Sequence, residues 1–201
     1  MTHIGHSEKV FDMKRLLLIL ILTLSFQSWI KADEVSDFKL EGISLGDSLL
    51  NFFDQKKIIR SKRNFYNDDK FLVSLLPTLN NDTMYEYIQV HYKRNDNKFF
   101  VYGIDGLVDV DIQECLKMQK KIVNEISSMF SKLKMKGPFT YNHSADATGK
   151  STTTHYEWQF DKANIEVVCY DFVKPMNFPD GLNVAIVSNE LQKWLNNEAY
   201  K

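Results

Sequence analysis

The stretch DIQECLKMQKKIVNEISSMFSKLK, residues 111–134, decides the fold of this chain. Its apolar residues recur at three- and four-residue spacing, which indicates an amphipathic helix with one face on a core. That apolar stripe comprises Ile112, Cys115, Met118, Ile122, Ile126, Met129 and Leu133. Asp111 stands at the N-cap with Glu114 in capping-box spacing, and Gly137-Pro138 follows as a stop. We expect one long helix over residues 111–134.

Strand patterns flank this helix on both sides. β-branched and aromatic residues, period-two alternation and short apolar runs mark six segments as strands. They are residues 71–76, 85–93, 99–110, 150–160, 165–173 and 182–187. Ser44 and Ser188 are each expected to cap a short helix, the first about ten residues long.

The predicted fold class is therefore α+β. We expect an antiparallel sheet of about six strands, with one long and two short helices packed on it. A rhythm of two helix-β-β-β halves is one interpretation of this order, although no residue repeat is visible.

A second stretch, LLLILILTLSF at residues 16–26, indicates where the protein goes. It follows Met13-Lys14-Arg15 and precedes the small residue Ala32, which together give the three parts of a secretory signal. The apolar run is shorter than the ~20 residues of a spanning helix. We expect cleavage between Ala32 and Asp33. An uncleaved anchor and a short buried helix are the alternatives.

The signal does not begin at residue 1. Residues 1–12 are polar and lack apolar periodicity, so they form an over-extended or disordered leader in this interpretation, with Met13 as the start. The predicted organisation is a leader at 1–12, a signal peptide at 13–32 and a single mature domain at 33–201. The mature part of 169 residues is long enough for one good core.

Charge excludes one class of partner. The first 32 residues hold four of the 25 basic and two of the 26 acidic residues, which leaves 21 basic and 24 acidic in the mature part. This balance gives no electrostatic case for nucleic acid. The one basic cluster, at residues 56–63, is expected in a solvated loop, with a phosphate or lipid contact as the alternative. After signal cleavage we expect no stable membrane insertion.

Cys115 and Cys169 are the only two cysteines in the chain. One falls in the first turn of the long helix and the other in a central strand. Export would place both in an oxidising compartment, where a helix packed on a sheet can bring them within bonding range. We predict a disulfide between them. Two buried thiols and a reactive cysteine are the alternatives.

The sequence carries no recognisable catalytic, cofactor-binding or metal-binding set. His91, His143 and His155 are scattered, and neither HExxH nor CxxC occurs. No GxSxG serine elbow occurs either. We therefore assign no catalytic residue, cofactor or metal from the sequence.

Two resemblances add to this picture. The start Gly42–Asp47, GISLGD, and the strands after it resemble the helix-then-hairpin modules of exported bacterial proteins, such as β-lactamase inhibitor proteins and small outer-membrane-assembly lipoproteins. The chain is also similar to uncharacterised exported, periplasmic proteins of marine bacteria. The matching features there are the signal, Gln113-Glu114-Cys115, Val168-Cys169-Tyr170-Asp171 and Asn197-Glu198-Ala199-Tyr200. These resemblances imply export and an α+β fold, and they supply no functional residue.

The expected function is that of a periplasmic or secreted, non-enzymatic binding or interaction module. Aromatic strand residues suggest a surface for a protein or small-molecule partner, with ordinary sheet packing as the alternative. They are Tyr85, Tyr87, Tyr92, Phe100, Tyr102, Tyr156 and Trp158. A small exported hydrolase is the rival function. It would require His91 or His155 within reach of an acid and a nucleophile.

Overall fold

A computed structural model describes residues 35–143 and 146–201 of the chain. All of the described residues belong to one compact unit. The predicted leader at 1–12, the signal at 13–32 and the cleavage between Ala32 and Asp33 lie outside the described residues.

The described residues form one eight-stranded sheet in which every neighbouring pair is antiparallel. The strand order is β1-β2-β3-β4-β8-β7-β6-β5. The strands are β1 (Lys62–Arg63), β2 (Phe71–Pro77), β3 (Tyr87–Lys93), β4 (Gly103–Asp109), β5 (Lys136–Asn142), β6 (Thr152–Gln159), β7 (Ala163–Asp171) and β8 (Gly181–Ser188). Two four-stranded meanders thus meet where β4 pairs with β8.

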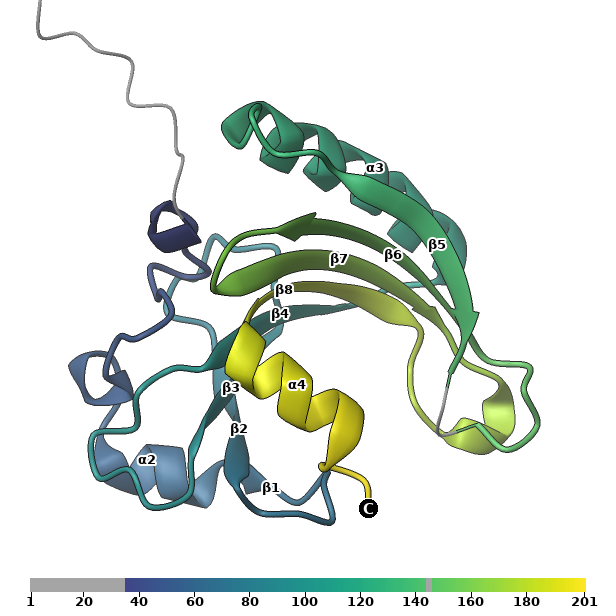
Figure 1. Cartoon of the computed structure of the whole chain (residues 1–201). Coiled ribbons are helices and arrows are strands. Elements are labelled where there is room, and N and C mark those ends of the chain that lie inside the picture. The colour runs from purple at the N-terminus through teal and green to yellow at the C-terminus, as the bar shows by residue number, and fades with distance from the viewer. Residues whose placement is uncertain (1–34, 144–145) are drawn as a thin grey trace, which may run out of the picture. The chain divides into compact units, whose positions relative to one another are not determined.

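Helices cover both faces of this sheet. The α-helices are α2 (Gln55–Arg60), α3 (Ile112–Met129) and α4 (Asn189–Asn197), and the short 3-10 helices are η1 (Val35–Asp37), η2 (Leu49–Asn51) and η3 (Lys174–Met176). The sheet is strongly curved, with α3 on its convex side and α4 on its concave side (Figure 1).

Strand alternation explains the division of side chains between the two faces. On the α3 side, β4 contributes Ile104 and Val108, and β8 contributes Val184 and Ile186. These residues are buried together with Cys115, Ile122, Val123 and Ile126 of α3. The amphipathic stripe of α3 therefore packs on the sheet through the main core, as its periodicity predicts.

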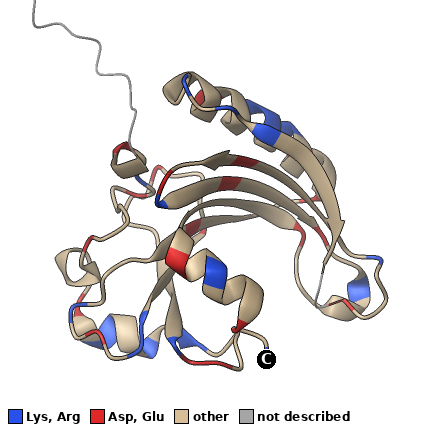
Figure 2. Cartoon of the chain, viewed as in Figure 1, with Lys and Arg blue, Asp and Glu red and all other residues tan. Residues whose placement is uncertain are grey.

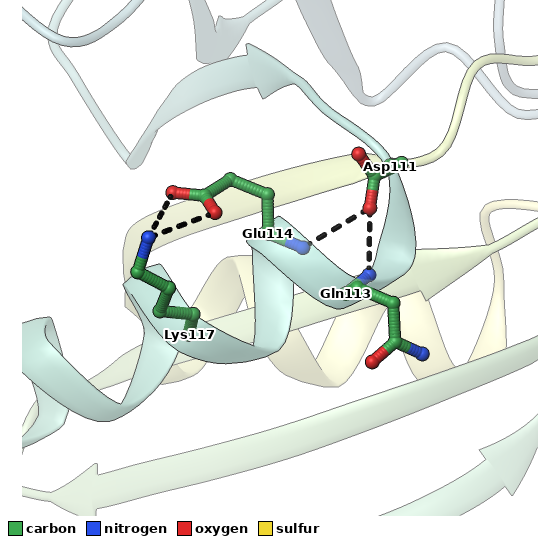
Figure 3. Close-up of polar contacts among 4 residues, drawn as sticks. All are labelled: Asp111, Gln113, Glu114 and Lys117. Atoms are coloured by element: carbon green, nitrogen blue, oxygen red, sulfur yellow. Dashed lines mark hydrogen bonds and ion pairs between the residues drawn. The ribbon is translucent and has the colours of Figure 1, made fainter.

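The N-cap of α3 is the one expected from the sequence (Figure 3). Asp111 Oδ1 accepts hydrogen bonds from the backbone N–H groups of Gln113 and Glu114, at 2.9 and 3.1 Å. The Glu114 carboxylate pairs with Lys117 Nζ at 3.1 Å, so it serves a pair along the helix rather than the second bond of a capping box. The helix ends at Met129, five residues before the predicted end, because Phe130 turns into the core as the C-cap.

The α+β class and the antiparallel sheet are confirmed, but the expected number of strands, about six, is wrong. The two strands not predicted are β1 and β5. β1 is only two residues long. β5 begins at Lys136 and contains Gly137-Pro138, a pair that in the sequence indicates the end of a helix rather than a strand. The suggested helix-β-β-β halves are each a helix followed by four strands.

The helix predicted from Ser44 is also wrong. The backbone N–H of Ser44 does donate to Asp47 Oδ2 at 2.9 Å, but this bond closes a turn. Gly46 in that turn has φ +83°, a left-handed conformation that interrupts a right-handed helix. The helix instead begins at Gln55, with Asp54 as its N-cap, so residues 56–60 of the basic cluster are helical rather than loop.

Candidate functional site

Cys115 and Cys169 form a disulfide, which confirms the predicted pair. Their Cα atoms are 5.9 Å apart, and 54 residues separate them along the chain. Both residues are completely buried in the main core. The bond joins α3 to β7 and has a structural role.

The concave face of the sheet is divided into a covered and an open part. α4 packs on the covered part through Leu191 and Trp194, which bury Phe71, Ala185 and Val187 beneath them. Gly103 permits this approach, because a Cβ there would lie 2.5 Å from Leu191 Cδ2. α4 thus covers the centre of the sheet, and none of the described α-helices lies over the concave side of β5–β7, which we call the open part of this face (Figure 1).

A buried polar group lies beside α4 and consists of Tyr66, His91, Asp105 and Asn183. Tyr66 Oη and His91 Nε2 are 2.8 Å apart and share a hydrogen bond. His91 Nδ1 lies 3.6 Å from Asp105 Oδ2. Asn183 Nδ2 donates to Asp105 Oδ1 at 3.1 Å. The four side chains make one chain of polar contacts from the loop after β1 to β8.

Burial controls the charges in this group. It raises the pKa of Asp105 to about 7, with a smaller upward contribution from Glu166. It lowers the pKa of His91 to about 4. Between these values the two side chains are therefore neutral, with the proton on Asp105, because neither charge is solvated at this depth.

The hydroxyl end of this group is packed into the C-terminal region. The Tyr66 ring makes edge contacts with Trp194 at 4.9 Å and with Tyr200 at 5.4 Å between ring centroids. Trp194 Nε1 also donates to Asp68 Oδ1 at 2.6 Å. These contacts hold the loop after β1 against α4, so the buried polar group stabilises the packing of α4 on the sheet.

The open part of the concave face carries an aromatic strip. Its residues are Phe139, Tyr141, His143, His155, Tyr170, Phe172 and Phe178. Tyr170 and Phe172 stack with centroids 5.4 Å apart, and Phe172 continues to Phe178 at 5.5 Å. Tyr141 is 54% exposed and Phe178 58%, so the strip presents aromatic surface to solvent.

An acidic row lies next to this strip. Asp105, Ala185, Glu166 and Glu157 are successive direct partners across β4, β8, β7 and β6, and Lys136 of β5 completes the row. Direct partners project to the same face of a sheet. Burial and the neighbouring Glu157 raise the pKa of Glu166 to about 7.

The aromatic residues proposed from the sequence do not share one surface. Tyr92 and Trp158 are buried in the main core, and Tyr85 and Tyr156 pack against it. Tyr102 packs on Phe71 on the opposite face. Tyr87 and Phe100 are exposed. The expected aromatic cleft is therefore wrong in its membership.

Of the three histidines in the described residues, His143 and His155 belong to the aromatic strip and His91 to the buried polar group. Burial lowers the pKa of both His143 and His155. The signal missed in the sequence was the alternation of Phe139, Tyr141 and His143. It is a strand pattern, but Gly137-Pro138 just before it was interpreted only as the stop of the long helix.

No group of three or more metal-ligating side chains occurs in the described part of the chain. No helix there is long and apolar enough to cross a membrane. A depression of about 500 Å³ lies where the segment after α3 and the start of β5 meet the end of β6 and the start of α4, lined by Lys134, Lys136, Gln159, Phe160, Asp161 and Asn189. Lys136 in it is already bonded to Gln159 Oε1 at 2.9 Å, so the depression offers little unused binding chemistry.

No protein-family model, curated protein or solved structure matches the chain.

Proposed function

We propose that this chain is an exported, non-enzymatic interaction module that binds a partner on the open concave face. The observation that carries the proposal is the aromatic strip. Exposed rings such as Tyr141 and Phe178 contribute large apolar areas with few rotatable bonds, which suits a binding surface.

Two further observations support export. Residues 13–32 have the pattern of a secretory signal. The Cys115–Cys169 disulfide is typical of proteins that mature in an oxidising compartment. The periplasm or the medium is therefore the compartment in which this module meets its partner.

A comparison of surface variants tests the binding face. Tyr141→Ala and Phe178→Ala remove exposed rings from the strip, and Phe65→Ala removes a ring of 48% exposure beside β1, at the other end of the sheet. A partner captured from the exported fraction should be retained by wild type and Phe65→Ala. It should be lost by the two strip variants. Equal retention by all four proteins would contradict the proposal.

A hydrolase is the second candidate, because His91 lies between a carboxyl group and a hydroxyl group. Asp105 is 3.6 Å from one ring nitrogen, and Tyr66 is bonded to the other. The Tyr66–His91 contact has the distance that a nucleophile and its base require, but His91 Nδ1 makes no hydrogen bond to Asp105. The packing of Tyr66 against Trp194 and Tyr200 favours the structural role.

Chromogenic ester, phosphoester and glycoside substrates separate these two roles. The interaction module predicts no turnover above buffer for wild type. Turnover that disappears in a folded His91→Gln variant would establish the hydrolase instead.

A further inference from the structure

We propose that the partner segment on the open concave face is an extended polypeptide bearing Lys or Arg, whose cation pairs with Glu166 while its neighbouring residues lie on the aromatic strip. This inference rests on the proposed binding function and adds the chemistry of the occupant.

The first argument is an unfavourable contact inside the sheet. Glu157 and Glu166 are direct cross-strand partners on β6 and β7. Like charges in this position destabilise a strand pair. Lys136 of β5 compensates the charge of Glu157, with Nζ 3.5 Å from Glu157 Oε1. No hydrogen bond or ion pair in the described part of the chain engages the Glu166 carboxylate. A cation from outside is therefore the group that this position lacks.

The second argument is the distribution of charge over the face. On the concave side, β4, β6 and β7 present Asp109, Glu157 and Glu166 to the surface, and the concave positions of β4, β6, β7 and β8 hold neither lysine nor arginine. Basic residues are concentrated on α2 and α3, whereas acidic positions mark the adjacent strands β6 and β7 (Figure 2). The open face is thus complementary to a cation, although the chain as a whole is close to neutral.

The third argument is spacing. Glu166, Val168 and Tyr170 alternate along β7 on this face, so Glu166 and Tyr170 are ~13 Å apart along the strand. An extended segment has the same rise per residue. A basic residue over Glu166 therefore places the residue four positions away over Tyr170, whereas Val168 between them is buried. The rings of the strip also attract cations through their faces.

The free edge of β5 favours a polypeptide over a free amine. β5 is the last strand of the sheet, and Phe139 and Tyr141 project from it as exposed side chains. An edge strand offers backbone N–H and C=O groups to another extended chain. β6 separates β5 from β7, so the segment over Glu166 cannot itself pair with this edge. The same polypeptide can continue across the strip to the edge, whereas a small amine reaches only the carboxylate.

Fluorescence anisotropy of the full chain with a labelled peptide of alternating Arg and Ser tests this inference. The same peptide with citrulline in place of Arg is the neutral control. Glu166→Gln removes the charge on the face, and Glu125→Gln removes the same charge from the exposed side of α3. We expect saturable binding of the Arg peptide, about tenfold weaker in Glu166→Gln and unchanged in Glu125→Gln. The citrulline peptide should also bind about tenfold more weakly.

Several results would overturn the inference. Equal binding of the two peptides, or equal weakening by the two glutamate variants, would remove the specific role of Glu166. Putrescine binding as tightly as the peptide would assign the site to free amines. A Tyr141-dependent dimer in sedimentation would assign the face to a second copy. If peptide binding depends on Tyr141 and Phe178 but not on Glu166, the inference fails while the proposed function stands.

Discussion

Glu157 and Glu166 lie directly opposite each other on the adjacent strands β6 and β7. Folding brings these two acidic side chains together on one face, where Lys136 at the edge is the single compensating cation among the described residues, and it pairs with Glu157. Sheets avoid such pairs because the repulsion costs stability. A position that breaks a local rule without compensation within the fold is where a functional constraint is expected.

Replacing Glu166 by Gln should stabilise the protein at high pH and leave it unchanged at low pH. The folded pKa of Glu166, about 7, lies above its ordinary value of 4.5. Its contribution to stability is therefore fully present below pH 4.5 and is lost as the pH rises through 7. We expect the free energy of unfolding of Glu166→Gln, measured in urea at pH 8, to be ~1–3 kcal/mol higher than that of wild type.

His155 and Asp105 on the same face also titrate and are present in both proteins, and loss of the Glu166 charge lowers the pKa of Asp105. The comparison at pH 4 therefore serves as the internal control. A Glu166→Gln variant less stable than wild type at pH 8 would show that the carboxylate has a stabilising partner.

The Cys115–Cys169 bond should account for a large part of the stability. It closes a separation of 54 residues, for which the chain-entropy relation gives ~4 kcal/mol. Urea unfolding of the double variant Cys115→Ala/Cys169→Ala, and of wild type with reductant, should show similar losses. Alkylation of either cysteine in the unfolded, unreduced protein would contradict the disulfide.

Gln119 connects α3 to the sheet by polar contacts inside an apolar stripe. Its Nε2 donates to the carbonyl oxygens of Thr154 and Val167 at 2.7 and 2.9 Å, and the residue is 1% exposed. Gln119→Leu leaves both acceptors without this donor and should cost ~1–3 kcal/mol in the free energy of unfolding. Gln113→Leu, at an exposed position of the same helix, should change it by less than ~0.5 kcal/mol.

The contact between Tyr66 and His91 should stabilise the C-terminal helix without serving chemistry. Tyr66→Phe removes the hydroxyl from His91 Nε2 and keeps the ring against Trp194. We expect a loss of ~1–2 kcal/mol in stability, with native Trp fluorescence retained. Full stability in Tyr66→Phe would show that the buried polar group does not hold α4 in place.

The sequence predicted those features that depend on local pattern. Asp111 and the apolar stripe specify α3 because capping and helical periodicity are both set within a few residues. The Cys115–Cys169 bond followed from the predicted elements, since no other cysteine is present.

The candidate site depended on pairing between distant strands. Glu157 and Glu166 became neighbours only once β6 and β7 were in register. Phe139 and Tyr141 joined the site only once β5 was recognised as a strand, despite Gly137-Pro138 at its start. The role of Gln119 could not be predicted from the sequence, because its partners are backbone carbonyl groups on β6 and β7, which no side-chain pattern reveals.

The central claim, that the open concave face binds a partner, is tested most directly by site-specific photo-crosslinking in the producing cell. A photoreactive phenylalanine replaces Tyr141 in one protein and Phe65 in another, since both positions are exposed but lie toward opposite ends of the sheet. The account predicts a discrete crosslinked species from position 141 and none from position 65. No crosslink at position 141, or the same species from both positions, would contradict it.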